Sequence, residues 1–73
     1  MTNTAVVGYG YAGRAFHTYL IGLEPRLDLY AISTRSAEAR RAAAQDHPEA
    51  VIYPGLDDLL ADDNVDLVIL ATP

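Results

Sequence analysis

The sequence predicts an α/β fold in which the strands of a parallel β-sheet alternate with helices in the order β-α-β-α-β-α-β. Short apolar runs alternate with segments of helical period along the 73 residues. The predicted connections are about 2–6 residues long, which is the usual length in α/β units. The last run, residues 67–71 (LVILA), is continuously apolar, which is typical of a parallel strand covered on both faces.

The first predicted strand and helix meet at a glycine-rich turn. Residues 5–7 (AVV) form an apolar run that ends at Gly8, as a buried strand does before a turn. A helical period follows from Ala12 to Glu24, where Pro25 disfavours helical geometry in the residue before it. The predicted buried face of this helix consists of Phe16, Leu20 and Leu23.

A second strand and a second helix are predicted next. Residues 27–33 (LDLYAIS) have strand character, and Ser36 is a suitable N-cap for a helix over residues 37–46. That helix contains five alanines, and Glu38 in its first turn complements the helix dipole. It ends before His47, which is expected on the surface of a loop.

The last part of the chain predicts a short strand, a short helix and a final strand. Residues 50–53 form the strand, which Pro54-Gly55 closes, and residues 65–71 form the last one after a turn at residues 62–64. The helix between them is expected to bury one face. That face consists of Leu56, Leu59 and Leu60. The acids at 57, 58, 62 and 63 lack the spacing of a calcium loop, so no metal site is expected.

Composition excludes several classes of function. The chain has five arginines, no lysine and a net charge of −5, so it lacks the clustered basic face that nucleic-acid binding needs. It has no cysteine and therefore no disulfide framework. No apolar run approaches the roughly 18 residues of a membrane span, and the N-terminus has no signal-peptide pattern. A cytoplasmic protein without a membrane or nucleic-acid partner is expected.

Residues 8–13 (GYGYAG) match the dinucleotide-binding pattern G-x-G-x-x-G, with a strand before, a helix after and a second strand about 20 residues on. The first glycine suits the tight turn, the second lets the backbone approach a pyrophosphate, and the third lets the helix lie near the strand. The N–H groups at the start of the helix then face the phosphates. The predicted phosphate-binding residues are Gly8, Gly10, Tyr11, Ala12 and Gly13. A nucleoside-triphosphate P-loop would need a lysine, which this chain lacks.

The end of the second predicted strand indicates which nicotinamide dinucleotide is bound. NAD-binding units place Asp or Glu there, where the carboxylate accepts hydrogen bonds from the ribose 2′-hydroxyl. Here the sequence is Ser33-Thr34-Arg35-Ser36, so hydroxyl groups can donate to a 2′-phosphate and Arg35 can pair with it. The sequence therefore favours NADP over NAD. The alternative is that these residues only end a strand and cap a helix.

Several segments together resemble the N-terminal domain of the Gfo/Idh/MocA oxidoreductases, a family named for glucose–fructose oxidoreductase, inositol dehydrogenase and a rhizopine-catabolism protein. The segments are residues 6–14 (VVGYGYAGR), Phe16-His17, Ser33-Thr34-Arg35-Ser36, Tyr53 before Leu59-Leu60, and residues 65–73 (VDLVILATP). The resemblance covers essentially the whole chain, and the closing Ala-Thr-Pro makes it more specific than the glycine loop alone.

The resemblance implies an NAD(P)-dependent oxidoreductase of a sugar, cyclitol or related polyol. It places Ser33, Thr34 and Arg35 at the adenosine ribose and Ala71, Thr72 and Pro73 beside the cofactor. Family members add a second α/β domain that supplies the substrate floor and usually the oligomer interface. Residues 1–73 are therefore expected to be the truncated N-terminal part of a Rossmann domain, inactive alone, within a larger, two-domain, homo-oligomeric parent.

Two departures from the family pattern limit what carries over. Many members have Asp where Thr34 stands, so their preference for NAD does not carry over. The family's catalytic Lys, in a Glu-Lys-Pro motif, and a downstream His have no counterpart before Pro73, so no catalytic residue is predicted. His17 is expected to pack at a helix edge. Two other functions stay open: a non-catalytic nucleotide-binding or scaffolding Rossmann module, and a structural fragment that associates through an unpaired sheet edge.

Overall fold

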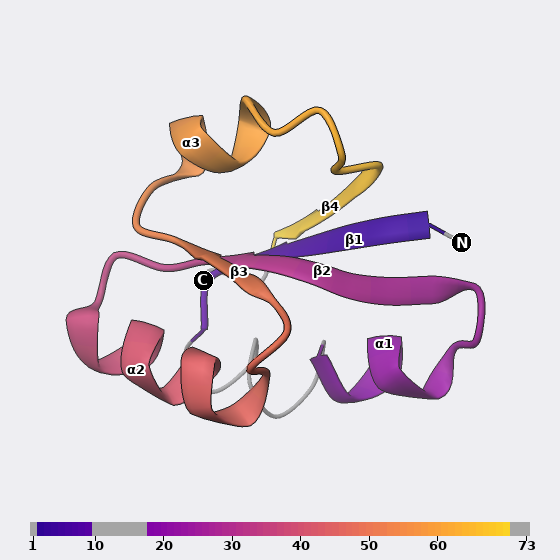
Figure 1. Ribbon diagram of the computed structural model, residues 1–73, viewed down its shortest axis with the longest axis horizontal. Coiled ribbons are helices and arrows are strands. Elements are labelled where there is room, and N and C mark those ends of the chain that lie inside the picture. The colour runs from indigo at the N-terminus through magenta and orange to yellow at the C-terminus, as the bar shows by residue number, and fades with distance from the viewer. Residues whose placement is uncertain (1, 10–17, 71–73) are drawn as a thin grey trace.

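The computed structural model describes residues 2–9 and 18–70 and confirms the predicted order of strands and helices (Figure 1). The strands in this part of the chain are β1 (Thr2–Val7), β2 (Leu27–Ser33), β3 (Val51–Tyr53) and β4 (Leu67–Leu70). The helices are α1 (Thr18–Leu23), α2 (Ala37–Asp46) and α3 (Leu56–Leu60). Of the helices described, none is long and apolar enough to cross a membrane.

The strands form one parallel sheet in the order β3-β2-β1-β4. In its middle, Val7 of β1 lies opposite Ser33 of β2 on one side and Leu70 of β4 on the other. The chain passes outward from β1 through β2 to β3 and then crosses to the far side of β1. The strand order reverses between β1 and β4, and open α/β sheets bind ligands beyond the carboxyl ends of the strands at such a point.

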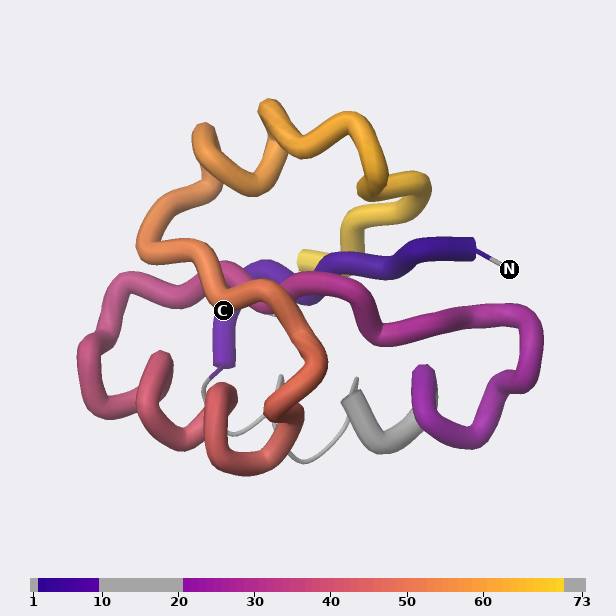
Figure 2. Tube along the Cα trace, in the orientation of Figure 1, coloured from indigo at the N-terminus to yellow at the C-terminus, as the bar shows by residue number. Residues whose placement is uncertain are grey.

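Helices cover both faces of the sheet, with α1 and α2 on one face and α3 on the other (Figures 1 and 2). The strand side chains alternate between these faces. Ala5 and Ala31 pack against Leu59 of α3, whereas Val6 packs against Ile21 of α1. The core between the sheet and α2 contains Tyr9, Ile32 and Ala43.

One extra residue in β2 shifts its register against β1. Thr4 lies opposite Leu29, but Ala5 lies opposite Ala31, so Tyr30 is a one-residue bulge. Tyr30 and Ala31 consequently both contribute to the core under α3. The bulge thus places an aromatic side chain where strict alternation would have turned it away.

Both α1 and α3 expose leucines that were predicted to be buried. In α1, Ile21 is buried and Leu23 is 63% exposed, so the prediction that Leu23 is buried was wrong. Successive helical residues lie about 100° apart, which puts Leu23 on the opposite side from Ile21. In α3 only Leu59 is buried, whereas Leu56 and Leu60 are exposed. A helix of five residues presents one leucine to the sheet and leaves its neighbours at the rim.

Two strands differ from their predicted extent. β1 begins at Thr2, before the apolar run, because the Thr2 N–H donates to the turn that precedes β2. β4 begins at Leu67, because Asp66 and Asn3 exchange two hydrogen bonds: the Asp66 N–H donates to the Asn3 carbonyl (2.8 Å), and the Asn3 N–H donates to Asp66 Oδ2 (2.9 Å). Leu67 and Leu70 are exposed. β4 is an edge strand of the described sheet, and its two middle residues pack on opposite faces, Val68 in the core under α3 and Ile69 in the core with Ile21 of α1.

Candidate functional site

The turn after β1 has the backbone geometry that the glycine pattern predicted for its first position. Gly8 has a φ of 97°, in the left-handed region where an L side chain is strained. Its N–H donates to the Ser33 carbonyl over 2.6 Å, which joins the carboxyl ends of β1 and β2. The remaining predicted cofactor contacts of the loop and of the last strand lie outside the described residues. They are Gly10, Tyr11, Ala12, Gly13, Ala71, Thr72 and Pro73.

Tyr9 anchors this turn to α2. Its side chain is 4% exposed and packs against Ile32 and Ala43. Its hydroxyl donates to Asp46 Oδ2 over 2.7 Å, and its ring meets His47 edge to face with ring centroids 6.0 Å apart. His47 follows α2 as predicted, but it is half-buried: its N–H donates to the Ala43 carbonyl as the C-cap of the helix, and its ring lies beside Tyr9.

In the turn between β2 and α2 (residues 33–36, called the β2–α2 turn below), the exposure of the residues increases along the chain. Ser33 is 3% exposed, Thr34 is half-buried, and the Arg35 side chain is exposed. The Thr34 N–H donates to the Tyr53 carbonyl over 3.1 Å, which ties the turn to β3. Ser36 Oγ accepts from the Ala39 N–H, so the predicted N-cap is confirmed.

Arg40 of α2 also contacts this turn, although no motif in the sequence pointed to it. Its Nη1 donates to the carbonyl oxygens of Thr34 (3.0 Å) and Arg35 (2.8 Å). A signal for it exists in the sequence. Arg40 lies one helical turn after the N-cap Ser36, and helical side chains lean toward the N-terminus of their helix. An arginine at this spacing is therefore positioned to reach back over the turn.

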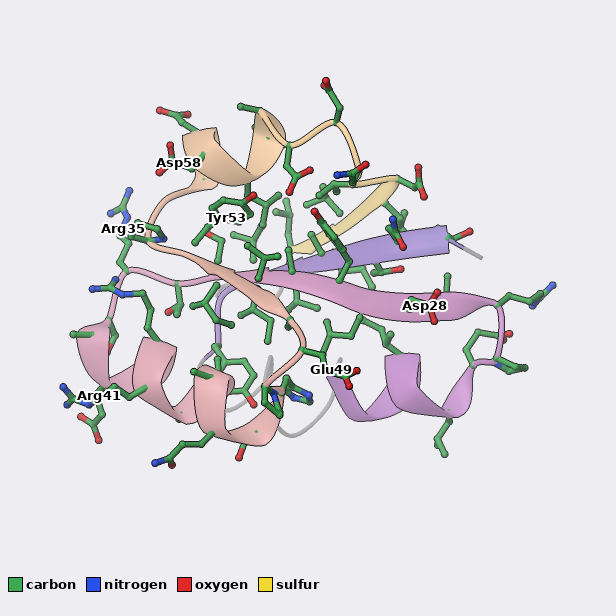
Figure 3. The ribbon with its side chains drawn as sticks, in the orientation of Figure 1. Asp28, Arg35, Arg41, Glu49, Tyr53 and Asp58 are labelled. Atoms are coloured by element: carbon green, nitrogen blue, oxygen red, sulfur yellow. The ribbon has the colours of Figure 1, made fainter. Side chains whose placement is uncertain are left out.

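The β2–α2 turn carries positive charge and contains no carboxylate. Figure 3 shows Arg35 leaving the turn at one end of α2, whereas Arg41 projects from the far side of that helix. Arg40 adds a second guanidinium beside the turn. Two guanidinium groups next to backbone N–H groups at a helix start make a surface that suits an anion.

A second polar cluster joins the sheet to the turn after α3. Asp62 Oδ2 accepts hydrogen bonds from the hydroxyls of Tyr53 (2.6 Å) and Tyr30 (2.9 Å), and Asp62 Oδ1 accepts from the Asn64 N–H (2.9 Å). The Tyr53 hydroxyl is the largest cause that lowers the pKa of Asp62, and the same hydrogen bond raises the pKa of Tyr53 to about 12. These groups satisfy one another, so we interpret the cluster as an attachment of the α3–β4 turn to the sheet.

Together these features define a class of protein. A parallel sheet of order β3-β2-β1-β4, a glycine with positive φ directly after β1 and helices on both faces are the first half of a Rossmann dinucleotide-binding fold. The chain belongs to the Gfo/Idh/MocA family: the family profile described as "Oxidoreductase family, NAD-binding Rossmann fold" matches residues 2–73.

Known relatives agree with this assignment. An uncharacterized oxidoreductase of Schizosaccharomyces pombe is 36% identical over 72 residues, which are 96% of this chain and 20% of that protein. A scyllo-inositol 2-dehydrogenase (NADP(+)) of Bacillus subtilis is 32% identical over 68 residues, 93% of this chain and 18% of that protein. The crystal structure of myo-inositol dehydrogenase from Lactobacillus casei, in complex with NAD(H) and myo-inositol, superposes with a TM-score of 0.86 at 30% identity, covering 99% of this chain and 22% of that one. The chain thus spans about a fifth of the length of the curated relatives it matches.

Proposed function

We propose that this chain is the cofactor-binding part of a longer NAD(P)-dependent oxidoreductase that prefers NADP and acts on a sugar, cyclitol or related polyol. The observation that carries the cofactor preference is the β2–α2 turn. It follows the strand after which NAD-binding units place an acid, yet it contains three hydroxyl residues and an exposed Arg35, and Arg40 donates hydrogen bonds to its backbone.

The described residues fit the adenosine side of such a dinucleotide. Thr34 is half-buried and Arg35 is exposed, so both side chains are accessible to a 2′-phosphate. Ser33 is buried, and its carbonyl is engaged by the Gly8 N–H, so its contribution is to hold the two turns together. A guanidinium is a planar multiple donor that matches phosphate oxygens, whereas a carboxylate at the same place would repel them.

The other predicted contacts extend the site along the carboxyl edge of the sheet. In this proposal residues 8–13 hold the pyrophosphate, and Ala71, Thr72 and Pro73 lie beside the cofactor toward its nicotinamide. When bound, the nicotinamide would supply the hydride acceptor or donor of the reaction. This chain would bind and orient the cofactor. The acid/base group of the reaction is assigned to the part of the protein after residue 73.

Two relatives support a polyol as substrate, because their names give scyllo-inositol and myo-inositol as the molecules they act on or bind. The same two names include both NADP(+) and NAD(H), so the choice of cofactor depends on the β2–α2 turn of this chain. A homo-oligomeric parent and a cytoplasmic location stay predictions from the sequence.

The cofactor preference is tested by substitution at Thr34 in the complete protein, with NADPH and NADH affinities measured by fluorescence titration. The wild type is expected to bind NADPH more tightly. Thr34→Asp should reverse or abolish that preference, since an acid beside a 2′-phosphate costs several kcal/mol. Thr34→Asn is the matched control with the same shape and no charge, and it should keep the preference. A wild type that binds NADH as tightly as NADPH, or a ratio unchanged by Thr34→Asp, would contradict the proposal.

The activity is tested by following NADPH formation from NADP with inositols and aldoses as substrates. Turnover of one of these by the complete protein supports the enzyme. Tight NADPH binding without turnover of any of them would favour the non-catalytic nucleotide-binding or scaffolding module instead.

A further inference from the structure

Arg40 closes the β2–α2 turn from the side of α2. One nitrogen of its guanidinium, Nη1, donates to two successive carbonyl oxygens, those of Thr34 and Arg35, at 3.0 and 2.8 Å. The neighbouring backbone groups are held as well. The Ser33 carbonyl accepts from Gly8 and the Thr34 N–H donates to Tyr53. The conformation of the turn is therefore set by contacts with the turn after β1, with β3 and with α2.

These contacts decide which groups the turn offers to a ligand. Every carbonyl from Ser33 to Ser36 already accepts a hydrogen bond, from Gly8, Arg40 or the α2 backbone. In contrast, the N–H groups of Arg35 and Ser36 donate to no acceptor within residues 2–9 and 18–70. The turn therefore presents donors and conceals acceptors, which is the pattern that an anion requires.

We propose that Arg40 is a positioning residue for the 2′-phosphate of NADP, because its hydrogen bonds to the Thr34 and Arg35 carbonyls hold the β2–α2 turn in this donor-presenting conformation. Without them, the two carbonyls are free to rotate toward the ligand and to meet the phosphate oxygens with like partial charge. The backbone of Arg35 would at the same time no longer be held in place, so its side chain would be less well positioned toward the phosphate. The inference rests on the proposed NADP preference and adds to it a residue of α2.

The test compares two ligands that differ only by the phosphate in question, adenosine 2′,5′-bisphosphate and 5′-AMP, by calorimetric titration of the complete protein. The ratio of their affinities reports the 2′-phosphate alone. Arg40→Met removes the donors and keeps the aliphatic stem. Arg41→Met is the matched control, since it removes the same charge from the next residue of α2, which is exposed and projects from the far side of the helix (Figure 3).

Arg40→Met is expected to weaken the bisphosphate about tenfold and 5′-AMP less than about twofold, a difference of the size of one lost charge-assisted hydrogen bond. Arg41→Met should leave the ratio within about twofold of the wild type, because exposed charges at a distance are screened. Arg40→Lys, whose ammonium can donate to both carbonyls, should recover most of the ratio. Thermal unfolding of each variant is measured alongside, and if Arg40→Met does not fold, Arg40→Gln takes its place.

The outcomes separate the two proposals. A wild type that binds the bisphosphate no more tightly than 5′-AMP overturns the NADP preference itself. A wild type with that preference, together with an Arg40→Met ratio that is unchanged or is matched by Arg41→Met, overturns only the role of Arg40.

Discussion

Replacement of Tyr9 by phenylalanine is expected to destabilise the fold by about 1 kcal/mol. The ring stays in place because Tyr9 is 4% exposed among Ile32 and Ala43, so packing is conserved and the 2.7 Å hydrogen bond to Asp46 is lost. A hydrogen bond to a charged acceptor contributes about 1.5–3 kcal/mol. Asp46 is exposed and regains water in the variant, which reduces the net loss to about 1 kcal/mol.

Urea unfolding of the 73-residue chain, followed by circular dichroism, measures this loss. A domain of this size has an m-value near the lower end of the usual range, about 1 kcal/mol per molar urea, so the midpoint should fall by about 1 M. Asp46→Ala removes the acceptor, and in that background Tyr9→Phe should cost much less. A loss below about 0.3 kcal/mol, or the same loss in both backgrounds, would show that this hydrogen bond does not hold the turn after β1.

Other substitutions test the same structure. Gly8→Ala should destabilise the fold by about 1–2 kcal/mol because φ is 97° there. Gly22→Ala, in helix α1 with nothing within 4 Å of the added Cβ, should instead stabilise it by up to about 1 kcal/mol. Equal effects of the two substitutions in urea unfolding would refute the strain at Gly8. Leu59→Ala should cost about 2–5 kcal/mol and the exposed Leu60→Ala less than about 0.5 kcal/mol, and similar losses for both would contradict the single buried leucine of α3. Because the folded pKa of Asp62 lies below the model-peptide value of 3.8, its stabilisation should be present above that pH and lost as the pH falls further. The pKa of Tyr53, raised from 10.0 to about 12, predicts a second loss of stability as the pH rises through that range. In a plot of the free energy of unfolding against pH, Asp62→Asn should flatten both the acid and the alkaline limb.

The order of elements was predictable because each depends on a local pattern. The β-branched and apolar runs identify the strands, and Ser36 with Glu38 identifies the start of α2. The orientation of the short helix α3 was not predictable in the same way. A helix of five residues has too few turns for its period to define a face, so the fit to the sheet decides that Leu59 is its buried residue.

The site was predictable where it depends on backbone conformation and not where it depends on contacts distant in sequence. Gly8 is recognisable because only glycine tolerates its φ, and the missing acid after β2 is visible in the sequence itself. The hydrogen bond of Tyr9 to Asp46 crosses 37 positions and depends on how α2 crosses the sheet, and no local pattern encodes that geometry. The meeting of Tyr30 and Tyr53 at Asp62 further requires the bulge in β2.

Both turns that the proposed cofactor would contact are attached to the same helix, one near each end of α2. Asp46 holds Tyr9 at the C-terminal end, and Arg40 holds the β2–α2 turn near the N-terminal end. The helix can do both because the face it presents to the sheet is made of small side chains, Ala39, Ala42 and Ala43. Their size leaves room for the Tyr9 ring between helix and sheet. A larger residue at Ala43, which is fully buried, would lift the helix and move both attachments together. Affinity for the pyrophosphate and selectivity for the 2′-phosphate are therefore expected to change jointly when the packing of α2 changes.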